Sequence, residues 1–190
     1  VVITYHRKAD DAAAVVNEIN QLGRKAVELQ LDCSDIKAFP AFARQLKLQL
    51  QQVWQREQFD FLVNNAGTGI YASFADTTEQ QFDSMLNEHL KGVFFLTQTL
   101  LPLISDGGRI LNVSSGLARF SFAGYTAYAV MKGAVEVLTR YLALELGERG
   151  IRVNVLAPGA IETDFGGGAV RDNPEVNQIF AAGTALGAAG

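Results

Sequence analysis

Short runs of apolar residues alternate along this chain with longer stretches whose apolar residues recur every three or four positions. The short runs predict five strands, at residues 1–5, 27–31, 59–63, 108–113 and 151–157. The longer stretches predict helices at residues 10–22, 36–57, 79–101 and from Tyr128 to about residue 148. Strands that alternate with helices of these lengths predict an α/β fold with a parallel sheet.

Three local features refine this pattern. The run at 59–63 is almost continuously apolar, which is typical of a central strand buried on both faces. Val15, Ile19 and Leu22 are spaced to form the buried stripe of the first helix. Trp54 is expected to pack on the apolar side of the second helix.

The segment from Gly166 onward differs from the rest in composition. It carries three consecutive glycines, an Asn173-Pro174 pair and an alanine- and glycine-rich end, which predict a loop or a weakly ordered segment. Residues 160–190 are therefore interpreted either as a loop that covers a substrate or as a mobile tail.

Composition narrows the classes of function. A chain of 190 residues with 48% hydrophobic and 19% charged residues suits one globular domain with its own core. Its net charge of −4, without a basic block, argues against a nucleic-acid partner. The single cysteine, Cys33, excludes an internal disulfide, and the two histidines lie too far from it to predict a zinc site. No apolar run reaches the length of a membrane span, so we expect a cytoplasmic protein without a membrane partner.

The segment from Ser115 to Lys132 carries the candidate chemistry. Tyr128 and Lys132 are four residues apart, so they share one face of the predicted helix, and Ser115 follows the fourth strand. A nearby ammonium group and a helix N-terminus favour a phenolate, so the Tyr128 pKa is expected to fall from ~10 toward neutrality. Such a tyrosine can exchange a proton with a carbonyl oxygen that the serine also binds. The alternative is a packed ring beside a solvated ammonium, which is common at this spacing.

Two further motifs accompany this trio. Asn64-Asn65-Ala66-Gly67 follows the third strand, Tyr128 and Lys132 form a YxxxK motif, and Pro158-Gly159 follows the fifth strand. From residue 1 to about residue 165 the chain resembles the short-chain dehydrogenase/reductase family, in particular its 3-oxoacyl-(acyl carrier protein) reductase-like members. The resemblance implies a Rossmann-type, doubly wound parallel sheet in three α/β/α layers. It also implies an oxidoreductase that interconverts a ketone and a secondary alcohol by hydride transfer with NAD(P)(H).

The resemblance assigns roles to individual residues. Tyr128 would be the acid/base, Ser115 would orient the substrate carbonyl, and Lys132 would hold the nicotinamide ribose and lower the Tyr128 pKa. Asp32 would contact the adenine and Thr163 the carboxamide. The residues that the resemblance implies for cofactor binding are Asp32, Asn64, Ala66, Gly67, Tyr128, Lys132, Pro158, Gly159, Ile161 and Thr163.

The end of the first strand bears on the choice of cofactor. An NAD-selective site places an acid there for the ribose 2′-hydroxyl, whereas this chain has Tyr5-His6-Arg7-Lys8. Arg7 suits a 2′-phosphate, so NADP(H) is preferred over NAD(H). The alternative is that Arg7 and Lys8 form a solvated charge pair.

Two departures from the family pattern concern the ends of the chain. The family's opening strand and glycine-rich phosphate loop are absent from residues 1–190, as are a further helix and strand at the other end. Without the opening strand, two strands would stand about 9–10 Å apart with unpaired buried backbone. Residues 1–190 are thus interpreted as one Rossmann domain that is incomplete at both ends, and we hypothesise that residues precede Val1 in the natural protein.

His89 is a third departure. The family usually carries an asparagine at this place in the helix, where it fixes a kink and a water of a proton relay. Histidine also bonds carbonyls and waters and titrates near pH ~6.5, so His89 joins the catalytic candidates, with a more pH-sensitive rate as the consequence. The alternative is a purely structural histidine.

Other functions on the same scaffold stay open. They are a non-catalytic nucleotide-binding or regulatory protein and an isomerase or lyase. The substrate is expected to be a small-molecule carbonyl or alcohol, in a site whose apolar walls are Leu117, Phe120, Phe122 and Phe165. The apolar run at 93–96 is compatible with a homodimer or homotetramer formed through this helix and the Tyr128 helix.

Overall fold

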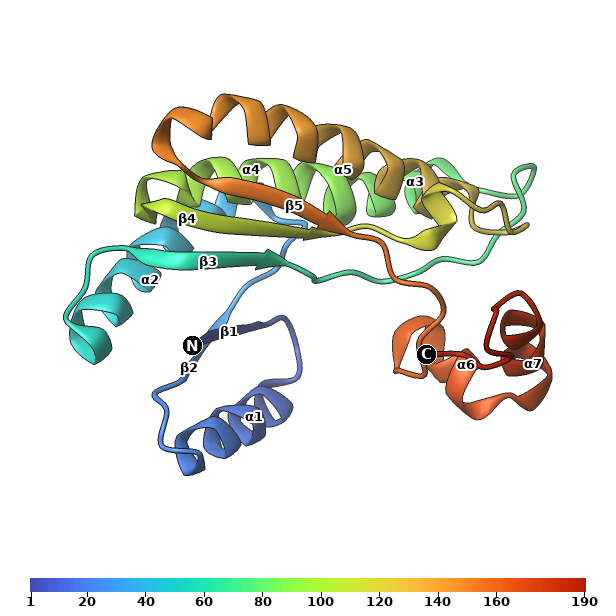
Figure 1. The fold of residues 1–190 in the computed structure, drawn as a ribbon, viewed down its shortest axis with the longest axis horizontal. Coiled ribbons are helices and arrows are strands. Elements are labelled where there is room, and N and C mark those ends of the chain that lie inside the picture. Colours follow the sequence, from blue (N-terminus) through green and yellow to red (C-terminus); the bar gives the residue numbers. More distant parts are fainter.

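The computed structural model describes all residues from 1 to 190. Its five strands are β1 (Val2–Tyr5), β2 (Val27–Gln30), β3 (Phe59–Asn64), β4 (Ile104–Val113) and β5 (Arg152–Leu156). Every predicted strand is present, and all strand pairs are parallel, as an α/β fold requires. The strands point the same way across the molecule (Figure 1), so the loops after their carboxyl ends gather at one edge.

The helices cover both sides of these strands. They are α1 (Ala9–Gln21), α2 (Phe39–Trp54), α3 (Glu79–Leu86), α4 (Gly92–Leu100), α5 (Thr126–Glu145), α6 (Ala169–Asp172) and α7 (Pro174–Ala182). A π-helical turn, Asn87–Lys91, joins α3 to α4 inside the single helix predicted for this region. Helices α3, α4 and α5 lie over β3–β5, and α1 packs against β1 and β2 from the other side (Figure 1). This confirms the three-layer Rossmann-type class. None of the helices combines the length and apolarity needed to cross a bilayer.

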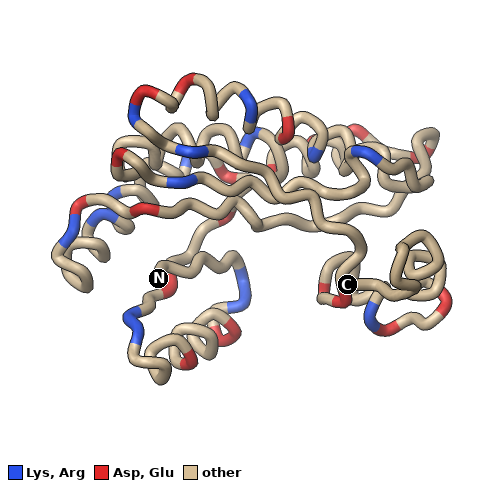
Figure 2. The backbone as a smooth tube through the Cα atoms, in the orientation of Figure 1, with Lys and Arg blue, Asp and Glu red and all other residues tan.

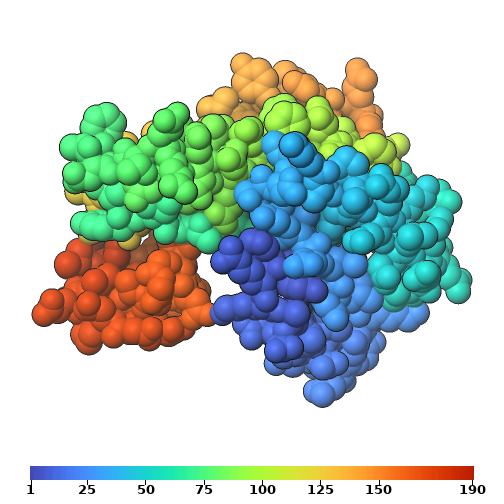
Figure 3. Space-filling view, turned by 180° about the vertical axis from the view of Figure 1, so that it is seen from behind, coloured from blue at the N-terminus to red at the C-terminus, as the bar shows by residue number.

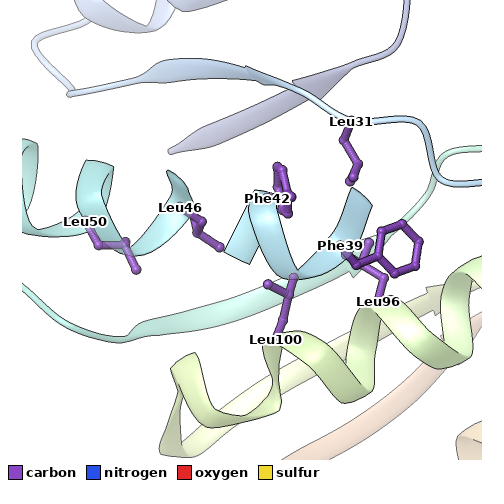
Figure 4. Packing of buried hydrophobic residues seen from close by; sticks show 7 residues of the cluster. All are labelled: Leu31, Phe39, Phe42, Leu46, Leu50, Leu96 and Leu100. Atoms are coloured by element: carbon purple, nitrogen blue, oxygen red, sulfur yellow. The ribbon is translucent and has the colours of Figure 1, made fainter. Parts of the chain in front are cut away.

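The largest apolar cluster joins α2 to α4. Its buried members are Leu31, Phe39, Phe42, Leu46, Leu50, Leu96 and Leu100 (Figure 4). Those on α2 follow the helical spacing that predicted this helix. Trp54 packs against the cluster, which confirms its expected place.

The buried stripe predicted for α1 is wrong in part. Ala12 and Val16 are the buried residues, whereas Val15 and Leu22 are exposed. Ala12 and Val16 lie one turn apart and form the face that meets β1 and β2. A short helix on a two-stranded sheet thus buries a narrower face than the sequence pattern allows.

The strands fall into two sheets, β1–β2 and β3–β4–β5. The facing edges of β1 and β3 do not pair, and a cavity of about 690 Å³ lies between them, lined mainly by apolar side chains of β1, β3, α2 and α4. The opening lies where the family pattern would place its first strand. Within residues 1–190, β3 pairs with β4 alone, so burial on both faces is not seen there, and Phe61 and Val63, which line this cavity, are exposed.

The segment after β5 is more regular than predicted. Asn173 accepts hydrogen bonds from the backbone N–H groups of Glu175 and Val176, and Pro174 occupies the first turn of α7. A capping side chain followed by proline is a helix start, so the Asn-Pro pair begins a helix rather than a loop. The segment forms a lobe separate from the N-terminal unit (Figure 3), and an ion pair of 3.8 Å between Lys8 and Asp164 links the two.

Candidate active site

Ser115, Tyr128 and Lys132 come together at the carboxyl end of β4. Ser115 begins the turn after this strand, where its Oγ accepts a hydrogen bond of 3.2 Å from the Leu117 N–H. Tyr128 lies in the first turn of α5, and Lys132 lies one turn further on; both side chains are buried. The helical spacing of four therefore places phenol and ammonium on the same inner face, as predicted.

The Tyr128 pKa lies above its ordinary value, contrary to the expectation of a depressed one. Burial of the phenol raises the pKa, the neighbouring Ser115 hydroxyl opposes the rise, and Glu88 and Tyr125 add to it. The Lys132 Nζ instead lies 5.5 Å from the ring centroid of Tyr128 and donates a hydrogen bond of 2.8 Å to the Val113 carbonyl. Tyr128 is therefore a protonated phenol at neutral pH, and thus a proton donor.

Lys132 is itself perturbed by its surroundings. Burial disfavours its charged form and lowers its pKa to about 8, while the Glu88 carboxylate opposes the shift. The ammonium is mostly protonated at pH 7 and loses its proton at mildly alkaline pH. A lysine with such a pKa, beside a buried phenol, is typical of a functional site.

His89 lies in the π-helical turn between α3 and α4 and is fully buried. Its Nε2 is 2.8 Å from the Thr68 carbonyl oxygen. A carbonyl can only accept, so Nε2 carries the hydrogen and Nδ1 is an acceptor, which has no protein partner. Burial, and secondarily the Lys132 charge, lowers the His89 pKa to about 4. The expectation that His89 titrates near neutrality is therefore wrong.

Gly67 lies directly against this histidine. A Cβ at Gly67 would come within 2.6 Å of the His89 Cε1, so a larger residue there would have to displace the buried His89 ring. The resemblance implies that this glycine binds the cofactor, and the structure shows in addition a contact within the protein that favours glycine here. Thr68 provides a second link between the loop after β3 and the π-helical turn, because its Oγ1 donates a hydrogen bond of 2.6 Å to Glu88.

A series of hydrogen-bonded polar side chains, here called the polar chain, lies in the interior next to the site, and it is not among the features predicted from the sequence. Asn64 Nδ2 donates to Thr97 Oγ1 at 3.0 Å and to Asn112 Oδ1 at 2.8 Å. Asn112 Nδ2 in turn donates to Thr139 Oγ1 at 2.9 Å. The Asn64 amide therefore joins β3 to β4 and α4, and Ala66, two residues further on, is exposed in the following loop. The sequence feature that indicates this polar chain is Asn112, a polar residue inside an otherwise apolar strand.

The segment after β5 runs beside the Ser115 turn. The Gly116 N–H donates to the Pro158 carbonyl at 2.7 Å, so Pro158 and Gly159 lie beside the turn that carries Ser115. Ile161 and Thr163 follow as exposed residues, and Thr163 Oγ1 accepts a hydrogen bond of 3.3 Å from the Phe165 N–H.

The predicted phosphate and adenine residues lie at the ends of β1 and β2. Arg7 is exposed and makes no ion pair, whereas Lys8 pairs with Asp11 at 3.4 Å. Asp32 accepts hydrogen bonds from Ser34, which lower its pKa, and it lies 3.4 Å from His6. Figure 2 shows the positive charge of the loop between β1 and α1 on the side that faces the C-terminal segment.

Comparison with known proteins agrees with this geometry. The family description enoyl-(acyl carrier protein) reductase matches residues 1–190. Elsinochrome reductase 1 of Elsinoe fawcettii is 35% identical over 167 residues, which cover 87% of this chain and 60% of that protein. The chain thus spans 60% of the length of this relative.

Two solved structures are similar to this chain in both sequence and fold. The angucycline C-6 ketoreductase LanV with bound NADP superposes with a TM-score of 0.93 at 32% identity, over 100% of this chain and 72% of that one. A short chain dehydrogenase from Burkholderia cenocepacia J2315 in complex with NADP gives a TM-score of 0.89 at 34% identity, over 100% and 74%. With its fold, its Ser115–Tyr128–Lys132 arrangement and a family match over every residue, the chain belongs to the short-chain dehydrogenase/reductase family.

Proposed function

We propose that this protein is an NADP(H)-dependent oxidoreductase that interconverts a ketone and a secondary alcohol. The observation that carries the proposal is the buried phenol of Tyr128, protonated at neutral pH, between the Ser115 hydroxyl and the Lys132 ammonium. The names of the similar proteins, elsinochrome reductase 1 and a C-6 ketoreductase with bound NADP, support the same reaction.

In the direction of reduction, the residues act on the carbonyl oxygen. Tyr128 donates its proton to this oxygen, and the Ser115 hydroxyl donates a hydrogen bond that orients it. The Lys132 ammonium stabilises the tyrosinate that remains. NADPH, when bound, would supply the hydride that the carbonyl carbon accepts. Proton transfer by a positioned side chain contributes about 10²–10⁴-fold to the rate.

The chain has groups that suit NADP(H). Arg7, an exposed guanidinium without an ion pair, follows a strand that ends without an acid, which fits a 2′-phosphate better than a 2′-hydroxyl. Asp32 would contact the adenine. The loop residues that would line the rest of the cofactor are Asn64, Ala66, Gly67, Pro158, Gly159, Ile161 and Thr163. Asn64 would do so through its backbone, since its side-chain amide is engaged in the interior.

His89 is proposed as a positioning residue. Its ring packs against Tyr128, and its Nε2 holds the Thr68 carbonyl, so it connects the loop after β3 to the catalytic phenol. Its unpartnered Nδ1 is an acceptor that suits a water of a proton relay.

We further propose an oligomeric state and a cellular location for this protein. Val130, Val137, Tyr141 and Leu144 form an exposed apolar stripe on α5, and Phe94 is exposed on α4. These faces suit a homodimer or homotetramer formed through the two helices. A cytoplasmic location is proposed from the single cysteine.

A Tyr128→Phe variant tests the reaction. NADPH oxidation is followed with a panel of ketones, and NADPH binding is measured by fluorescence. The variant is expected to lose about 10²–10⁴-fold in kcat/KM while it still binds NADPH. Tyr141→Phe, an exposed tyrosine on the same helix, is the matched control. Unchanged turnover in Tyr128→Phe, or NADPH binding without any ketone reduction in the wild type, would instead favour a regulatory protein or an isomerase.

A further inference from the structure

Aromatic rings from three separate segments gather around Tyr128. Tyr71 comes from the loop after β3, Phe122 and Tyr125 from the loop before α5, and Phe165 and Phe180 from the C-terminal segment. Phe122 stacks on Phe180 with ring centroids 5.1 Å apart and planes at 28°. Tyr71 and Tyr125 meet edge to face at 5.4 Å.

These rings are not a hydrophobic core. Phe122 and Phe165 are each 39% exposed and Tyr71 is 71% exposed, whereas the core residue Phe39 is fully buried. Single exposed aromatics are ordinary on protein surfaces, but here Phe165 contacts Tyr128 itself, and Tyr71 and Phe122 both contact Tyr125, three residues before it.

The ring of Phe165 already occupies the space next to Tyr128. Its centroid lies 5.5 Å from that of Tyr128, and its Cζ would be only 2.7 Å from a Cβ at Gly69. A planar molecule between two rings needs a contact gap of about 3.5 Å on each side, or about 7 Å in all. A substrate ring must therefore take the place of Phe165 rather than slip between the two.

The chain after Phe165 permits such a movement. Gly166, Gly167 and Gly168 follow with φ of 63°, 73° and 78°, a backbone conformation that glycine adopts at little cost. Three such residues in a row can absorb a large change in direction. The Phe165 ring can then move outward and form part of the wall of the site together with Phe122.

We propose that the site takes a planar, fused-ring aromatic ketone. Its rings stack against Phe122 and the displaced Phe165, and its carbonyl oxygen reaches Tyr128 and Ser115. This inference rests on the proposed ketone reduction and adds the chemical class of the substrate. It selects against saturated ring ketones of the same size, which lack a flat face to stack.

The test compares 1-tetralone with 1-decalone, which share a carbon skeleton but differ in one aromatic ring. We expect kcat/KM to favour 1-tetralone by about tenfold, and the preference to fall by about two- to tenfold in Phe122→Leu, the range measured for one aromatic pair. Phe94→Leu is the control, because Phe94 is 42% exposed on α4 and contacts none of these rings. Its preference should equal that of the wild type.

Two results separate this inference from the proposed function. Turnover of both ketones with no preference, or a preference that Phe122→Leu leaves unchanged, overturns the aromatic site and leaves the reductase intact. Absence of turnover with either ketone, despite NADPH binding, overturns the reductase. Calorimetric binding of 1-naphthol and decahydro-1-naphthol then tests the aromatic site by itself: tighter binding of 1-naphthol, weakened by Phe122→Leu, supports it, and equal binding overturns it.

Discussion

The ring of His89 stands edge-on to the ring of Tyr128, with the two centroids 5.1 Å apart and the planes at 87°. This is the favoured geometry of an aromatic pair, in which a ring edge meets a π face. The other side of His89 is held by the hydrogen bond from Nε2 to the Thr68 carbonyl. The His89 ring therefore lies between the loop after β3 and the phenol of Tyr128 and contacts both.

Replacement of His89 by asparagine should lower kcat without changing the shape of the pH–rate profile between about pH 5.5 and 8. The reason is that the His89 pKa, about 4, leaves the imidazole neutral over this range. kcat is measured with saturating ketone and NADPH. An inflection near pH ~6.5 that the wild type shows and His89→Asn lacks would contradict the buried, neutral imidazole.

The same pKa has a consequence for stability. The His89 pKa of about 4 in the folded protein lies below the unfolded value of 6.5. The buried neutral imidazole therefore makes its full contribution to the free energy of unfolding above pH 6.5, and this contribution is lost as pH falls toward 4. The loss reaches up to about 3 kcal/mol of unfolding free energy. Urea titrations at several pH values should show this slope in the wild type and less of it in His89→Asn. His6→Asn, at an exposed histidine, is the control and should keep the slope.

Reduction should slow as pH rises through about 8, because Lys132, whose pKa is about 8, then loses its charge. The kcat/KM for NADPH is the appropriate measurement, since it reports groups of the free enzyme. In Lys132→Arg the group stays charged, so the residual activity should lose this alkaline limb. Lys91→Arg, an exposed lysine in the same region, should keep it. An unchanged limb in Lys132→Arg would assign the titration to another group.

Arg7→Ala should weaken NADPH binding by about 10–100-fold and leave NADH binding nearly unchanged, because only NADPH carries the 2′-phosphate. Dissociation constants for both nucleotides, measured by fluorescence titration, give the comparison. Arg24→Ala provides an exposed control just beyond α1. If NADPH and NADH lose affinity equally, Arg7 contacts a part of the nucleotide other than the 2′-phosphate. Arg7 then gives no support for a preference for NADP(H).

Asn112→Ala should lower the free energy of unfolding by about 1–3 kcal/mol. The substitution leaves the amide of Asn64 with one partner fewer and the Thr139 hydroxyl without its donor. Urea unfolding can be followed through Trp54, the only tryptophan. Asn154→Ala, on the exposed face of β5, should have little effect. Equal losses in the two variants would mean that the polar chain contributes no more than a surface amide.

The local sequence of this protein determined its elements and the spacing of its chemistry. Apolar period and helix length placed all five strands and the four main helical regions, and the spacing of Tyr128 and Lys132 placed them on one helix face. These features depend on backbone geometry over a few residues, which a sequence carries directly. The cap of α7 is also a local signal, because Asn173 and Pro174 mark a helix start, although their segment is predicted above to be a loop or weakly ordered.

The tertiary structure decided the properties that depend on burial, namely protonation states and buried hydrogen bonds. The raised Tyr128 pKa, the neutral His89 and the Asn64–Asn112–Thr139 chain all depend on which groups from distant segments exclude water together. Desolvation is a long-range property, so the sequence indicated the candidate catalytic residues, while the packing around them decided their protonation.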